Sequence, residues 1–83
     1  MSKIIMGFLL HERMKTASQV QELLTKYGCE INTRIGLHAA STEVCSPQGL
    51  ILLEFIDDAD DKVKDFEKEL KEIAEVDIQK MKF

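Results

Sequence analysis

The sequence predicts a single α+β domain in which four strands and two helices follow one another in the order βαββαβ. Three observations lead to this prediction. An apolar run opens the chain at residues 3–10, amphipathic helical patterns lie at about 16–27 and 57–74, and two strand patterns lie between them. The 83 residues have room for one hydrophobic core, so we expect one domain over residues 1–83.

The first strand and the first helix are predicted from their hydrophobic patterns. The apolar run at 3–10 is typical of a central strand that is covered on both faces. Thr16 and Gln19 have the spacing of a capping box at the helix start, and Gly28 is expected to end the helix in the left-handed conformation. Between them, apolar residues at three- and four-residue steps make one stripe: Ala17, Val20, Leu23, Leu24 and Tyr27.

The two middle strands are predicted at 29–38 and 49–56. The first alternates cleanly and would turn one set of side chains to the helices: Ile31, Thr33, Ile35 and Leu37. In the second, Leu50 and Leu52 share a face with Glu54. We therefore expect Arg34 and Glu54 to pair on the face without helices, next to the two leucines.

The second helix and the last strand complete the predicted fold. Asp57 and Asp58 are expected to open the helix, by capping and by their interaction with the helix dipole. Its apolar stripe consists of Val63, Phe66, Leu70, Ile73 and Ala74, and residues 76–83 read as the fourth strand. This order is the ferredoxin-like sandwich, a four-stranded antiparallel sheet of order 4-1-3-2 with two helices on one face.

The face of the sheet without helices is expected to be an interface. Leu50, Leu52 and one set of side chains from the first strand would leave an apolar surface there, with Arg34 beside it. Apolar patches of this size usually mark protein contacts, and a domain this small gains stability from self-association. The sequence therefore predicts a homo-oligomer in which the sheets meet face-to-face or edge-to-edge. It is also compatible with a protein partner on this surface.

Composition indicates which classes of partner the protein can bind and in which compartment it is expected. A net charge of −4 and a pI near 5.1 argue against direct contact with nucleic acid, which needs clustered Lys and Arg. No apolar run approaches the roughly 20 residues that span a bilayer, and the start of the chain lacks a signal peptide pattern. The two cysteines have no CxxC spacing and are expected to be reduced thiols. We expect a cytoplasmic protein.

Two stretches, LLTKYGCEINTRIGLH (23–38) and CSPQGLILLEF (45–55), together with the βαββαβ order, resemble the iron-only hydrogenase system regulators. These are small ACT-like proteins, related in fold to the C-terminal domain of the nickel-responsive regulator. The resemblance implies a non-enzymatic regulatory module that self-associates and senses a small ligand or a partner. ACT domains that bind amino acids commonly place a glycine after their first strand, but residues 11–15 read HERMK, so amino-acid binding in the usual groove is not expected.

His38 and Cys45 flank the loop between the middle strands and form a candidate site for a transition metal. Imidazole and thiolate suit Zn, Ni or Cu, and the nickel-responsive regulator, which this chain resembles, uses a His and a Cys on the corresponding hairpin. One His rather than two precedes the loop here, so His11 or Cys29 would have to complete the set. The alternatives are a solvated histidine, a loop thiol and, at Cys29, a small buried apolar residue.

Any specific ligand is expected in a groove where the 39–48 loop and the turn after Leu10 approach a subunit interface. His11, His38 and Cys45 are the groups best able to contact a ligand there, because loops on a rigid sheet usually carry function. An enzyme is not expected, since no third group orients His38 as a base for Cys45.

Overall fold

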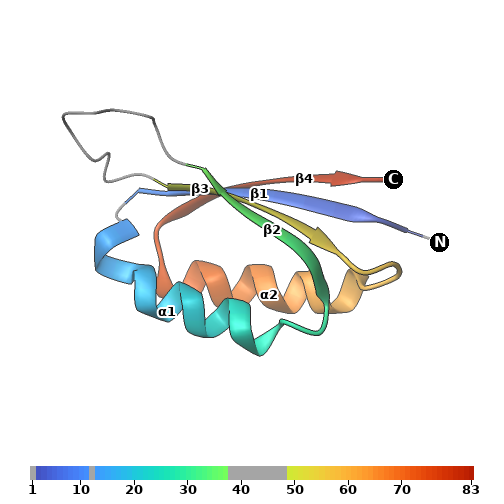
Figure 1. Ribbon diagram of the computed structural model, residues 1–83, viewed down its shortest axis with the longest axis horizontal. Coiled ribbons are helices and arrows are strands. Elements are labelled where there is room, and N and C mark those ends of the chain that lie inside the picture. The colour runs from blue at the N-terminus through green and yellow to red at the C-terminus, as the bar shows by residue number, and fades with distance from the viewer. Residues whose placement is uncertain (1, 12, 38–48) are drawn as a thin grey trace.

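The computed structural model describes residues 2–11, 13–37 and 49–83 and confirms the predicted order of elements (Figure 1). The elements are β1 (Ile4–Leu10), α1 (Arg13–Lys26), β2 (Ile31–Leu37), β3 (Gly49–Phe55), α2 (Asp60–Ile73) and β4 (Val76–Lys82).

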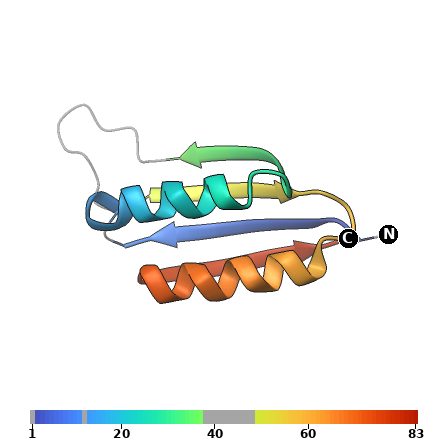
Figure 2. The ribbon, with the colours of Figure 1, turned by 90° about the horizontal axis from the view of Figure 1, so that it is seen from below.

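The four strands form one antiparallel sheet of order β2-β3-β1-β4, which is the predicted order read from the other edge. Both helices lie on the same side of this sheet (Figure 1). Seen from that side, α1 runs along the β2 and β3 half and α2 along β4 (Figure 2). The ferredoxin-like prediction is confirmed, and the sheet keeps one face without helices.

The core lies between the sheet and the helices. In β1 every second side chain is buried, and these buried side chains are Ile4, Met6, Phe8 and Leu10. Phe66 of α2 is fully buried at the centre, with its ring 5.4 Å from that of Tyr27, 5.7 Å from Phe55 and 6.2 Å from Phe8. The Tyr27 and Phe55 rings meet Phe66 edge to face and the Phe8 ring is tilted against it, and such aromatic contacts stabilise the core beyond the burial of the rings.

The start and end of α1 differ from the prediction. The helix begins at Arg13, so Thr16 lies within its first turns and does not cap it. Residues 13–15 are Arg, Met and Lys, which have high helix propensity. The helix therefore begins closer to β1 than predicted. Gly28 does not have a positive φ; its amide donates to the Thr25 carbonyl at 3.1 Å, and the chain leaves the helix through this tighter turn.

The start of α2 also differs, because Asp57 and Asp58 precede the helix instead of opening it. Asp58 has a φ of 58°, and its carboxylate and amide both bond to the backbone of Ser2. Ala59 is the N-cap residue and makes no side-chain capping bond. The contacts with the N-terminal strand hold the two aspartates in the turn, and the helix begins one residue after Ala59.

Tyr27, the residue after the end of α1, is hydrogen-bonded to α2. Its hydroxyl donates to the Glu69 carboxylate, which also receives the Lys26 ammonium. The Glu69 carboxylate, assisted by burial, raises the pKa of Tyr27 to about 12, while Lys26 and then Tyr27 lower the pKa of Glu69. The protonated phenol is therefore favoured in the folded state.

Tyr27→Phe is expected to remove a stabilisation that depends on pH. A raised folded-state pKa contributes stability that is complete below the ordinary pKa of 10 and is lost as the pH rises toward about 12. Below pH 10 the variant should be less stable by about 1 kcal/mol, the usual value of one such hydrogen bond. Urea unfolding at about pH 8 and about pH 11 measures this, and a difference that persists at the higher pH would contradict it.

Candidate functional site

The candidate site is the face of the sheet opposite the helices, which we call the open face. Strand register identifies its side chains, because residues paired across strands share a face: Ile5, Gly7 and Leu9 of β1, Thr33 and Ile35 of β2, Leu50, Leu52 and Glu54 of β3, and Asp77, Gln79 and Met81 of β4. Leu53 and Phe55 alternate with them and are buried toward the helices.

Apolar side chains dominate the middle of the open face. The exposed fraction is 49% for Ile35, 37% for Leu50 and 56% for Met81, while Ile5, Leu9 and Leu52 are half-buried. Leu50 and Leu52 therefore lie on this face as predicted. The expectation that β1 is covered on both faces is wrong within the described chain, because the helices cover only one side of it.

Gly7 shapes the centre of the open face. It pairs with Leu52, and a Cβ atom at Gly7 would lie 3.0 Å from the Cδ2 atom of the Leu52 side chain. The missing side chain thus lets Leu52 lie across β1 instead of projecting from the sheet. A glycine inside a strand often marks such a close approach. The apolar surface at the centre of the sheet is therefore flattened where Leu52 lies against Gly7.

The prediction that Arg34 lies on the open face is wrong, because β2 contains a bulge. Ile31 pairs with Phe55 but Thr33 pairs with Glu54, so one extra residue lies between these pairs. The bulge keeps Ile31 on the helix side and reverses the alternation after it. Arg34 consequently pairs with the buried Leu53 and reaches Gln21 of α1. Thr33 and Ile35, both predicted to face the helices, lie on the open face instead.

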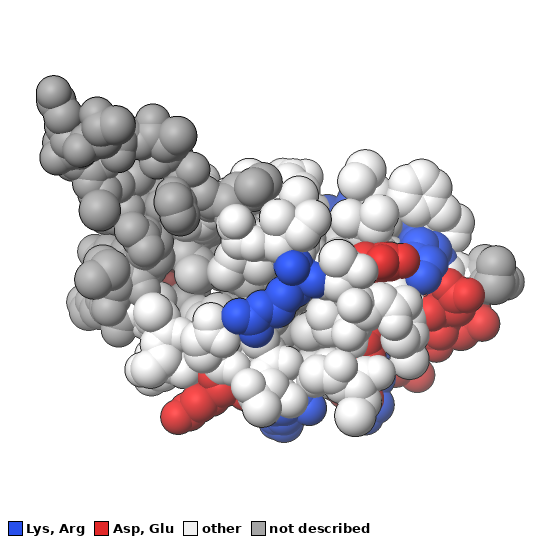
Figure 3. Space-filling model, in the orientation of Figure 1, with Lys and Arg blue, Asp and Glu red and all other residues white. Residues whose placement is uncertain are grey.

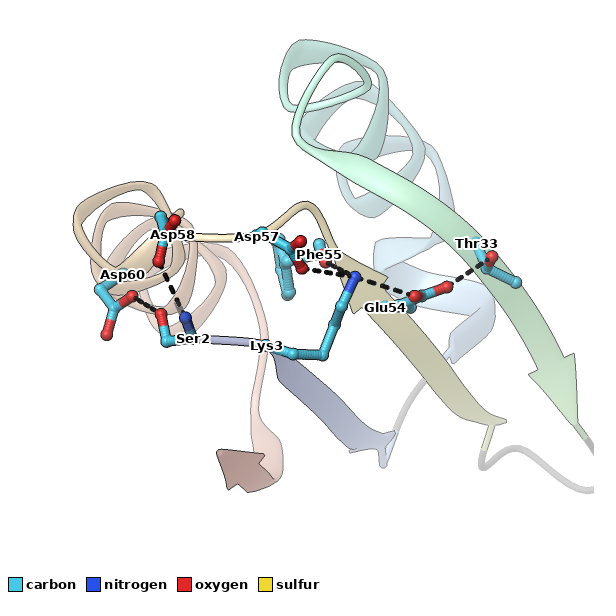
Figure 4. A network of polar contacts seen from close by, with 8 residues as sticks. All are labelled: Ser2, Lys3, Thr33, Glu54, Phe55, Asp57, Asp58 and Asp60. Carbon is cyan, nitrogen blue, oxygen red and sulfur yellow. Dashed lines mark hydrogen bonds and ion pairs between the residues drawn. The ribbon is translucent and has the colours of Figure 1, made fainter. Parts of the chain in front are cut away.

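Glu54 has Lys3 and Thr33 as partners instead of Arg34, and this group closes one end of the open face (Figure 4). The Lys3 ammonium lies 3.1 Å from the Glu54 carboxylate and 2.9 Å from that of Asp57. Hydrogen bonds that Lys3 donates to Asp57 and then to Glu54 raise the pKa of Lys3, and the bonds that Glu54 accepts from Lys3 and Thr33 lower the pKa of Glu54. The one ammonium at this end is thus paired with two carboxylates of the same chain, which leaves the group with a net negative charge.

The predicted metal and ligand residues are only partly described. His38 and Cys45, and with them the groove predicted at the 39–48 loop, lie outside the described residues. His11 lies just after β1, and its Nε2 atom is 2.8 Å from the Asp77 carboxylate. Cys29 is exposed, so its prediction as a buried apolar residue is wrong. The described residues include no group of three or more side chains able to hold a metal ion, and the metal site stays a prediction.

Comparison with known proteins supports the fold. No family model and no curated protein matches the sequence. Among solved structures, the uncharacterized protein TM1266 from Thermotoga maritima is 21% identical, with a TM-score of 0.71 over 100% of this chain and 99% of its own. The nitrogen regulatory PII-like protein CPII from Thiomonas intermedia K12, bound to ADP, AMP and bicarbonate, is 8% identical, with a TM-score of 0.65 over 100% and 91%.

A designed protein has the same fold as well. The de novo protein Foldit4 is 12% identical, with a TM-score of 0.54 over 96% of this chain and 94% of its own. At these identities the likeness establishes a small ferredoxin-like domain and nothing about its ligand. Within the described part of the chain, neither helix has the length and apolar character needed to cross a membrane.

Proposed function

We propose that this chain is a non-enzymatic, ACT-like regulatory module that self-associates through its open face and senses a small ligand or a partner. The apolar open face is the observation that carries the proposal. The resemblance of residues 23–38 and 45–55 to the iron-only hydrogenase system regulators supports the regulatory role. CPII, a regulatory protein of this fold that was bound to ADP, AMP and bicarbonate, lends support to ligand sensing.

The chemistry of the open face favours a second copy of this chain as the molecule that covers it. Its middle is apolar, so two copies would bury the same kind of surface against each other, as a two-fold interface requires. Lys3 at one end already has Glu54 and Asp57 as partners, and Asp77 at the other end has His11. The Lys3 ammonium and the Asp77 carboxylate thus each have a polar partner within their own chain, which lowers the cost of bringing them to an interface.

Light scattering on the purified protein tests this proposal. At micromolar concentration the measured mass is expected to be at least twice the 9.5 kDa of one chain. The expected assembly should persist in high salt, because apolar burial does not weaken as ion pairs do when salt is added. A mass of one chain at these concentrations would contradict self-association.

A metal sensor is the second candidate, and the position of His11 favours it. Leu10 pairs with Gly49, so His11 lies at the end of the sheet where β3 begins. A carboxylate that bonds one ring nitrogen, as Asp77 does, is the usual way to orient a ligating histidine. Metal analysis of protein purified without a histidine tag distinguishes the two candidates.

A further inference from the structure

A groove on the helix side of the sheet, away from the open face, has the size of a ligand site. Its volume is about 410 Å³, and it is lined by Leu24, Thr25 and Gly28 at the end of α1 and by Ile31, Asn32 and Arg34 of β2. Sites for small molecules usually measure about 300–1,000 Å³ and combine apolar walls with a few polar groups. Leu24 and Ile31 provide such a wall here, and Asn32 and Arg34 provide polar groups.

The bulge in β2 places both polar groups at this groove. The register passes from Ile31 to Thr33, so Asn32 opposes no residue of β3 and its side chain is exposed. The same bulge turns Arg34 to the helix side, where one guanidinium nitrogen donates to the Gln21 side-chain oxygen at 3.0 Å. Bulges that redirect a side chain in this way are common beside functional sites.

Arg34 has no carboxylate partner among residues 2–11, 13–37 and 49–83. Its hydrogen bond is to the neutral amide of Gln21, so its positive charge is not paired within the described chain. In the view of Figure 3, most of the described surface is uncharged. A guanidinium with unused donors suits a carboxylate, which it can bind through two parallel hydrogen bonds.

The surroundings favour a singly charged anion over a phosphate. Thr25 and Gly28 lie at the C-terminal end of α1, where the helix dipole is negative and opposes added negative charge. Arg34 is the one cationic side chain that lines the groove. One guanidinium near a helix C-terminus balances one negative charge, and a dianion would leave the second uncompensated.

We infer that this groove binds a small monocarboxylate with a short apolar chain. Its carboxylate would contact Arg34 and Asn32, and its apolar chain would lie against Leu24 and Ile31. The inference deepens the proposed function and rests on its sensing role, since it assigns the class of ligand that is sensed. It does not depend on the open face, which lies on the other side of the sheet.

Titration with 3-methylbutanoate, followed by the backbone amide signals in NMR spectra, tests the inference. Signals of Gly28, Ile31 and Arg34 are expected to shift and saturate, with a dissociation constant on the order of 1 mM for so small a probe. The neutral 3-methylbutanamide should bind at least about tenfold more weakly, because it cannot form the charge-assisted bonds. Equal binding of the amide, or shifts that lie elsewhere, would overturn the inference.

Variants separate the role of Arg34 from a general effect of charge. Arg34→Gln and Arg34→Lys should each weaken binding at least about tenfold, since both lose the guanidinium fork. Lys62→Gln removes a positive charge from an exposed position on α2 and should bind as the parent does. Light scattering on the same samples reports assembly separately. Binding that survives in folded Arg34 variants would refute the inference while leaving self-association intact.

Discussion

Replacing Leu52 with Lys is expected to convert the assembled protein into single chains of 9.5 kDa while leaving its helical content unchanged. Leu52 lies over Gly7 at the centre of the open face, so a two-fold contact on that face would bring the two new ammonium groups close together. An unpaired charge buried in an apolar contact costs about 3 kcal/mol or more, which weakens association at least a hundredfold. In the single chain the longer Lys side chain can extend into water.

Light scattering and far-UV circular dichroism on the same sample check this result. Ser18→Lys, which adds the same charge at an exposed position on α1, is the matched control and should remain assembled. If Leu52→Lys keeps the parent mass, the open face is not the interface. If both variants dissociate, the effect comes from net charge and the location assigned to the interface is wrong.

Side-chain periodicity alone predicted the sheet and its open face, and it failed where β2 departs from simple alternation. Leu50 and Leu52 were assigned correctly because β3 keeps a regular two-residue repeat opposite Leu53 and Phe55. In β2, one extra residue at Asn32 reverses every later position. Nothing in a single sequence marks that residue, so Arg34 and Ile35 were placed on the wrong faces.

The ends of the helices were less predictable because tertiary contacts decide them. Asp57 and Asp58 are residue types that favour the start of a helix. Their bonds to Lys3 and Ser2, near the N-terminus, nevertheless hold them in a turn before it. Local capping rules contain no information about such a partner. The same limit applies to the groove between α1 and β2, which requires both the bulge and the helix end to be in place.

Phe66→Ala is expected to cause the largest loss of stability of any change considered in this protein. Phe66 is fully buried, and its ring contacts those of Phe8, Tyr27 and Phe55 where the helices meet the sheet. Truncating a core phenylalanine costs about 3–5 kcal/mol through lost burial and the cavity left behind. A domain of this length has a total stability of roughly 4–12 kcal/mol, so the change removes a large share of it.

Urea unfolding of Phe66→Ala is best measured in a chain that also carries Leu52→Lys, so that assembly does not add to the stability. In this background Phe66→Ala should strongly lower the urea concentration at the unfolding midpoint. Part of the protein is expected to be unfolded even without urea. Phe83→Ala makes the same chemical change at a side chain that is 70% exposed, and should alter stability by no more than about 0.5 kcal/mol. A loss at Phe66 no greater than that at Phe83 would show that the three ring contacts do not form the centre of the core. A loss of the expected size would show that packing between α2 and the sheet supplies most of the stability. This packing lies on the side away from the open face. The fold therefore does not need the open face for its stability, and that face can serve for association.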